Sequence, residues 1–133
     1  MLEARARLLH DRLMSLVTRV VEIRGLVLVD RNGLPLVSTL GSRNLAEGLA
    51  AFAAVATEQM ERAQTDFQMG PLYLMHLAGR DRQIFVTPLT PEVTLVAIVD
   101  AGATAATVNL HLLGMCREIL AVLMSGEEEP ENP

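Results

Sequence analysis

The chain has 133 residues, which is enough for one domain with its own core but too few for two domains of ordinary size. Half of the residues are apolar, which excludes a wholly disordered chain. The formal net charge of −5 argues against a protein that binds nucleic acid by general electrostatics. We expect one domain over residues 1–125, followed by an acidic, disordered tail over residues 126–133 that carries four glutamates.

The sequence indicates a cytoplasmic protein without membrane insertion. The single cysteine, Cys116, cannot form an intramolecular disulfide, and the chain has no zinc-type spacing. The first residues lack the apolar run and the cleavage site of a signal peptide. The longest uncharged stretch, Ala101–Cys116, is too short and too polar to cross a bilayer.

The first quarter of the chain predicts a helix followed by a β-hairpin. Apolar residues recur at helical spacing from Leu2 to about Ile23, and Gly25 is expected to end this helix. Leu26–Val29 predicts a buried strand, and the turn Asp30–Gly33 leads into a return strand over Leu34–Leu40. A proline near the start of the return strand favours a position at the edge of a sheet.

The remaining elements follow in the same way. Asn44, with Glu47 three residues later, predicts the N-cap of a central helix that ends at about Asp66. Three strands and a last helix are expected over Leu72–Leu77, Gln83–Leu89, Val93–Val99 and Thr104–Met124. The order α-β-β-α-β-β-β-α, joined mainly by hairpins, predicts an α+β fold with an antiparallel five-stranded sheet and helices on its faces.

The central helix carries two neighbouring apolar stripes. A stripe of large residues suits packing on the sheet and comprises Leu45, Leu49, Phe52, Ala56, Met60, Ala63 and Phe67. A stripe of small residues would let a second helix dock closely and comprises Ala46, Ala50, Ala53, Ala54 and Thr57. The alternative is that these alanines serve only helix propensity. The outward face includes Glu58 and Arg62 and is made less polar by Ala51 and Val55.

The third strand suggests self-association. Leu72–Leu77 is apolar on both faces except at His76 and Tyr73. If this strand lies at a sheet edge, its open backbone groups can pair with another copy. Together with the small-residue stripe, it predicts a homodimer whose sheet continues across the interface.

The sequence offers no catalytic or cofactor-binding motif. It contains neither a phosphate-binding loop nor a dinucleotide fingerprint, and it has no lysine. His10, His76 and His111 lie in three different elements, and none has a second ligand at metal-binding spacing. We therefore expect no metal, no cofactor and no enzymatic activity.

Several segments resemble the roadblock/dynein light-chain domain. GLVLVDRNGLPLVS (residues 25–38) resembles its first hairpin, with Gly25, Asp30 and Gly33 at matching places. Residues 45–60 resemble its alanine-rich central helix, and residues 84–100 resemble its last two strands. The order of the elements also agrees, so the resemblance covers the chain to about Met124.

The resemblance implies a roadblock-like sandwich that dimerises through its central helices and third strands. It also implies a non-catalytic partner of a Ras-like small GTPase, similar to the bacterial regulators of a gliding-polarity GTPase. The alternative is a scaffold or adaptor dimer that does not affect nucleotide hydrolysis, and a small-molecule sensor is a third class. The implied dimer face comprises Ala46, Ala50, Ala53, Ala54, Thr57, Leu72, Leu74 and His76. The implied GTPase-binding face comprises Ala51, Val55, Glu58 and Arg62.

Overall fold

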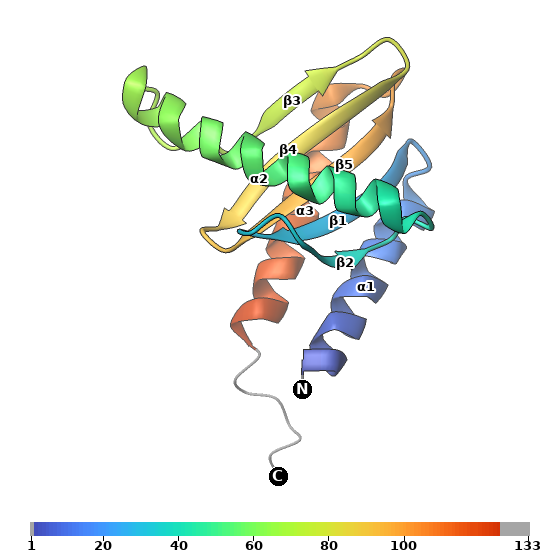
Figure 1. Ribbon diagram of the computed structural model, residues 1–133. Helices are drawn as coiled ribbons and strands as arrows, with labels where there is room; N and C mark the ends of the chain where they lie inside the picture. The colour runs from blue at the N-terminus through green and yellow to red at the C-terminus, as the bar shows by residue number, and fades with distance from the viewer. Residues whose placement is uncertain (1, 126–133) are drawn as a thin grey trace.

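The computed structural model describes residues 2–125 and has the expected order of helices and strands (Figure 1). The elements are α1 (Leu2–Arg19), β1 (Ile23–Asp30), β2 (Pro35–Ser38), α2 (Arg43–Asp66), β3 (Met75–Ala78), β4 (Arg82–Thr90), β5 (Val93–Asp100) and α3 (Ala105–Met124). The tail expected over residues 126–133 lies outside the described residues.

The strands form one antiparallel sheet in the order β2-β1-β5-β4-β3. This confirms the α+β class and the five-stranded antiparallel sheet. The central strands β1 and β5 are buried along most of their length, which explains their continuous apolar sequences. The edges are β2, as its proline predicted, and β3, which has no strand on its outer side among residues 2–125.

The sheet separates two helical layers, with α1 and α3 on one face and α2 across the other (Figure 1). Successive residues of a strand point to opposite faces, so each strand contributes to both cores. In β1, Leu26 and Leu28 pack in the core beneath α1 and α3. Val27 and Val29 pack in the smaller core beneath α2.

Helix α2 packs on the sheet through its small residues. Ala46, Ala50 and Ala53 are at most 4% exposed and share a buried cluster with valines of the sheet. The prediction that the large-residue stripe faces the sheet is therefore wrong for Leu45, Phe52 and Phe67, which are exposed, although it holds for Leu49, Ala56 and Met60. Alanine allows the helix to lie close to the flat surface of β-branched side chains, and the buried face of the helix includes neighbouring residues of both stripes.

The β1–β2 turn forms as its sequence predicted. The Asp30 carboxylate accepts hydrogen bonds from the backbone N–H groups of Asn32 (2.9 Å) and Leu34 (3.0 Å). Gly33 has a φ of +84°, and a Cβ added there would lie 3.2 Å from the Cβ of Ala54 in α2. The turn thus needs glycine both for its backbone conformation and for its contact with the helix.

The structure corrects two helix boundaries. The N-cap of α2 is Ser42, whose hydroxyl accepts a hydrogen bond from the N–H of Leu45, so the prediction of Asn44 is wrong by two residues. Both side chains can cap, but the chain leaves its extended conformation at Ser42. Gly25 does not end α1, which stops at Arg19. It lies inside β1, where an added Cβ would clash with Leu40.

Strand β3 is shorter than predicted and begins at Met75, not at Leu72. The side-chain oxygen of Gln64 in α2 accepts a hydrogen bond from the backbone N–H of Leu72, at 2.6 Å. That bond holds the segment before β3 against the helix. Gly70, two residues before Leu72, has a φ of +75°. The backbone of Leu72 therefore lies outside the ladder with β4.

Candidate interaction surface

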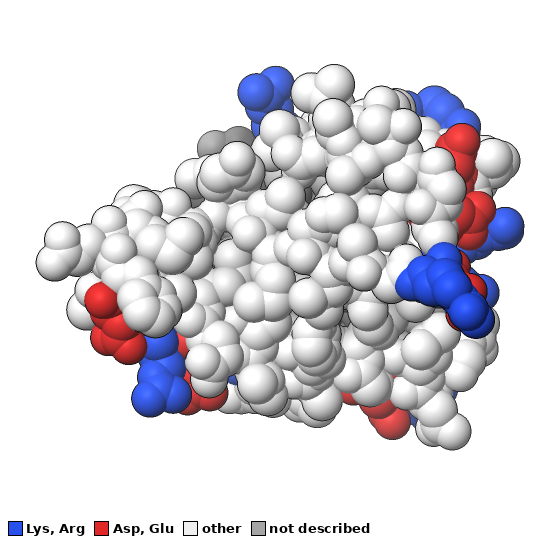
Figure 2. Space-filling view, turned by 90° about the horizontal axis from the view of Figure 1, so that it is seen from above, with Lys and Arg blue, Asp and Glu red and all other residues white. Residues whose placement is uncertain are grey.

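The β3 edge of the sheet lies on a broad surface without charged side chains at its centre. Figure 2 looks down on this edge and shows arginine, aspartate and glutamate only around the margin of the uncharged area. Large apolar side chains are exposed on the elements that form this side, including Tyr73 (65%) and Leu77 before and within β3. An exposed, uncharged strand edge favours pairing with another strand.

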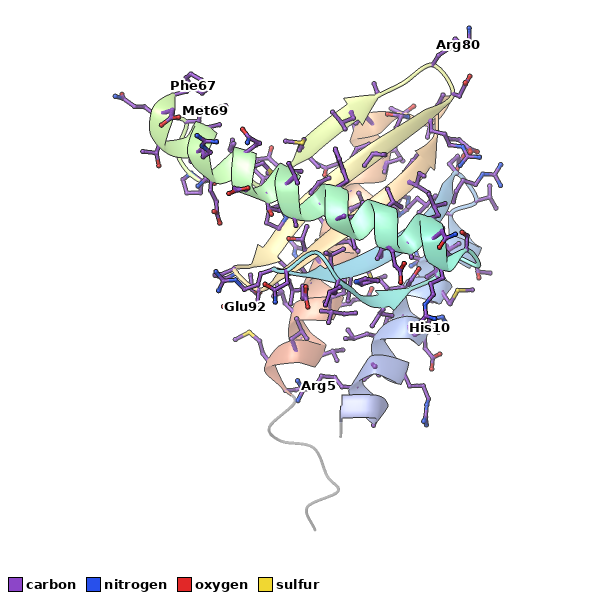
Figure 3. All side chains as sticks on the ribbon, viewed as in Figure 1. Arg5, His10, Phe67, Met69, Arg80 and Glu92 are labelled. Carbon is purple, nitrogen blue, oxygen red and sulfur yellow. The ribbon has the colours of Figure 1, made fainter. Side chains whose placement is uncertain are left out.

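The second half of α2 extends beyond the sheet beside this edge (Figure 1). Phe67 and Met69 lie at its far end, pointing away from the rest of the domain (Figure 3), and Phe67 is 73% exposed. Arg80 lies at the tip of the β3–β4 turn, away from that end (Figure 3). The apolar side chains thus gather at the α2 end of the surface.

A cleft of about 630 Å³ lies between α2 and the segment leading into β3. One wall is the flank of α2 that carries Gln59, Ala63 and Phe67, with the charged side chains of Arg62 and Asp66 at its outer side. The other wall includes Leu72 and Leu74, both half-buried. Phe52 lies two helical turns before Gln59 on the same flank. The cleft, this flank of α2 and β3 together form one mainly apolar surface, which we call the edge surface.

The members of the implied dimer face lie in three different places. Leu72, Leu74 and His76 belong to the edge surface. Ala46, Ala50 and Ala53 are covered by the sheet of their own chain. Ala54 and Thr57 are half-buried on the opposite flank of α2, beside the β4–β5 turn. The sequence pattern predicted that Phe52 and Phe67 lie in the core, but both are exposed on this flank of α2.

His76 is held in place by a buried glutamine that the sequence did not single out. The amide nitrogen of Gln83 donates hydrogen bonds to the backbone oxygens of Asp100 (3.0 Å) and Ala103 (2.9 Å). Its amide oxygen is therefore the acceptor, and Nε2 of His76, at 2.7 Å, is the donor. The imidazole also stacks on Phe85, with ring centroids 4.4 Å apart. Contacts within its own chain therefore fix the orientation of the His76 ring.

The implied GTPase-binding residues form one outward stripe. Ala51, Val55, Glu58 and Arg62 are all exposed and lie on the side of α2 opposite the sheet. Val55 and Glu58 also line a groove of about 700 Å³ between α2 and the β4–β5 turn. Its walls combine charged, apolar and proline residues.

The described residues contain no cluster of three His, Cys, Asp or Glu side chains that could hold a metal ion. Cys116 is buried in α3, and this burial raises the pKa of its thiol from 9.0 to about 11. Its reactive thiolate form is therefore disfavoured at neutral pH.

Helix α3 is long and apolar enough to cross a membrane by length and composition alone. Six of its residues, however, lie in the core between the sheet and α1. Core helices of globular domains satisfy the same criterion, so composition alone does not indicate a membrane span here.

The sequence matches the family model of the Roadblock/LC7 domain over residues 9–99. No curated protein matches it significantly. The fold is similar to that of a Roadblock/LC7 domain from Streptomyces avermitilis, with a TM-score of 0.80 and 20% identity over 86% of this chain and 97% of the other. It is similar to Myxococcus xanthus MglB, with a TM-score of 0.79 and 19% identity over 88% of both chains. It is also similar to a structure of MglB with a tetrameric arrangement, with a TM-score of 0.79 and 16% identity over 90% of both chains.

Proposed function

The chain belongs to the Roadblock/LC7 family, and we propose that it is a homodimeric, non-catalytic regulator of a small Ras-like GTPase. Its role is that of a regulator or adaptor in cell polarity, in keeping with the structural similarity to MglB. The observation that carries the proposal is the edge surface, an uncharged strand edge that continues into an exposed apolar helix flank. Beside it, the outward stripe of α2 remains accessible for a second protein.

In the proposed dimer, β3 pairs with β3 of a second copy, and the sheet continues across a two-fold axis. The axis stands perpendicular to the sheet, because that operation makes the two edge strands antiparallel. The α2 flank with Phe52, Gln59 and Ala63 then faces the same flank of the second helix. This assignment moves the helical part of the interface away from Ala46, Ala50 and Ala53.

The dimer is tested by substituting Phe52, which is exposed enough for the monomer to tolerate a change. We expect wild type to have the mass of two chains in light scattering, and Phe52→Glu to have the mass of one. The matched control is Val21→Glu, a similar change at an exposed apolar residue outside the edge surface. Circular dichroism checks that both variants remain folded. A Phe52→Glu variant that keeps the dimer mass would exclude this flank from the interface.

The proposed GTPase contact is the outward stripe Ala51, Val55, Glu58 and Arg62. Pairing through β3 brings two such stripes to the same face of the dimer. Arg62 contributes a surface contact and does not enter the nucleotide site. The regulator therefore changes hydrolysis through the conformation of the GTPase, without supplying a catalytic group.

The experiment is equilibrium binding to the Ras-like GTPase of the same genome, loaded with a GTP analogue or with GDP. We expect preference for the GTP form, and Val55→Glu to weaken binding at least about tenfold while leaving the dimer intact. Val21→Glu should bind as wild type does. Single-turnover hydrolysis then separates a regulator that activates the GTPase from an effector. Equal or absent binding in both nucleotide states would contradict the proposal and favour the scaffold function.

A further inference from the structure

The groove between α2 and the β4–β5 turn has one wall with two carboxylates. Glu58 and Glu61 both line it from α2, and because they are three residues apart they lie on one face of the helix. Both residues are exposed, and neither forms an ion pair or a side-chain hydrogen bond with another described residue. The fold therefore leaves both carboxylates available to a ligand in the groove.

The opposite wall is apolar and held in place by the chain itself. Pro88 and Pro91 line it, and their rings fix the backbone φ at both positions. Between them, the Thr90 hydroxyl accepts hydrogen bonds from the backbone N–H groups of Glu92 (3.1 Å) and Val93 (3.0 Å). These bonds fix the β4–β5 turn, and Glu92 lies at its tip (Figure 3). A ligand that packs on this wall needs to order little of the protein.

The two ends of the groove differ. At one end, the side-chain oxygen of Gln64 accepts its hydrogen bond from the backbone N–H of Leu72 and joins α2 to the segment before β3. At the other end, Arg31 belongs to the β1–β2 turn, which contacts α2 at Ala54. Ala54 precedes Glu61 by about 10 Å along the helix. With two carboxylates and one guanidinium among its lining residues, the groove is negatively charged.

We propose that this groove binds an arginine side chain of the partner GTPase. The inference rests on the proposed function and adds a residue class by which the partner is selected. A planar guanidinium can donate hydrogen bonds to two carboxylates at once, whereas the ammonium of lysine is a compact point charge. The apolar stem of the arginine then packs on Leu72 and on the two prolines of the opposite wall.

Charge disfavours the other occupants. Residues 126–133 of the chain carry four glutamates, which the carboxylates of the groove would repel. The phosphates of a nucleic acid or of a membrane surface are disfavoured for the same reason. The described residues contain no group of three side chains that could hold a metal ion, in the groove or elsewhere. A basic protein side chain remains the occupant that complements the groove.

The first test is equilibrium binding of the GTPase, loaded with a GTP analogue, to wild type and to Glu61→Lys. Glu61 lines the groove but does not belong to the outward stripe. We expect the variant to bind at least about tenfold more weakly. Rising salt should weaken the binding of wild type more than that of the variant.

The matched control is Glu22→Lys, the same change of charge at an exposed residue between α1 and β1. It should bind the GTPase as wild type does, and circular dichroism checks that both variants remain folded. A Glu61→Lys variant that binds as tightly as wild type overturns the inference.

A peptide titration tests the groove without the GTPase. Acetyl-Gly-Arg-Gly-amide and its lysine and glutamate counterparts are added to the full chain, and the backbone amides are followed by NMR. We expect the arginine peptide to shift the amides of Glu58, Glu61 and Thr90, the lysine peptide to shift them less, and the glutamate peptide to leave them unchanged. The shifts should be lost in Glu61→Lys. Equal shifts with arginine and lysine would overturn the assignment to arginine.

The two proposals can fail separately. If Val55→Glu weakens GTPase binding and Glu61→Lys does not, the GTPase contact is correct and the inference about the groove is wrong. If the GTPase binds in neither nucleotide state but the arginine peptide still shifts the groove amides, the proposed function is wrong and the groove binds arginine of another protein.

Discussion

Replacing Ala53 by leucine tests whether the small residues of α2 face the sheet or a second chain. Ala53 is fully buried and shares a cluster with Val27, Val29 and Val96 of the sheet. Leucine adds three carbon atoms where the helix and sheet are already in contact. Overpacking of this kind costs about 1–3 kcal/mol of unfolding free energy.

The expected change is large enough to measure. An unfolding entropy of about 2.1 cal/mol/K per residue over 133 residues converts that cost into a fall in Tm of about 4–11 °C. The matched control is Ala51→Leu, the same change two residues earlier on the exposed side of α2, which should stay within about 0.5 kcal/mol of wild type. Urea unfolding gives the free energy of unfolding of both variants. It is carried out at two protein concentrations, because the apparent stability of a dimer depends on its concentration.

The result that would refute this reasoning is equally specific. If Ala53→Leu keeps the stability of the folded chain but halves the mass in light scattering, then Ala53 contacts a second copy. The assignment of the small stripe to the interior of the domain would be wrong, and the interface implied by the sequence resemblance would be restored.

Three further changes probe other parts of the structure. Gln83→Leu removes the hydrogen bonds to the β5–α3 turn and should lower the free energy of unfolding by about 2–4 kcal/mol. The control Gln64→Leu should lower it clearly less. Equal losses in the two variants would show that the buried hydrogen bonds of Gln83 add no stability. At pH 8 the Cys116 thiol should react with a thiol reagent about 100-fold more slowly in the folded protein than in urea, because its pKa is about 11 when folded and 9.0 when exposed. Between pH 9 and pH 11 the Cys116 thiol ionises in the unfolded chain but not in the folded protein. The free energy of unfolding should therefore fall as the pH rises above 9. A free energy of unfolding that does not change with pH in this range would argue against the raised pKa of Cys116. Gly33→Ala should cost about 1–2 kcal/mol in thermal unfolding, whereas Gly41→Ala should be nearly neutral, and equal effects would exclude backbone strain at the turn.

The order of elements could be predicted from the sequence because its signals are local. The spacing of apolar residues distinguishes helices from strands within a few turns, and the Asp30–Gly33 turn carries its own hydrogen bonds and glycine. The start of α2 could not be predicted to the residue, because two residues near it are both suitable N-caps. Ser42 and Asn44 can both cap a helix, and only the path of the preceding chain selects Ser42.

The segment before β3 depended on a contact that no local pattern contains. Leu72 has the sequence of a strand residue, yet its N–H bonds to Gln64, eight residues earlier in α2. Gln83 is similar, since its partners come from the distant β5–α3 turn and from His76. Such bonds arise only after the sheet and helices have packed.

The sequence by itself determined that α2 has two adjacent apolar stripes and that the chain folds as one α+β domain. The tertiary structure decided which residues of each stripe are buried, namely Ala46, Ala50 and Ala53 of the small stripe and Leu49, Ala56 and Met60 of the large stripe. Both stripes are apolar and lie side by side on the helix, so hydrophobicity alone favours either one. Close approach to the valine-covered sheet buries these alanines and leaves Phe52 and Phe67 on the surface.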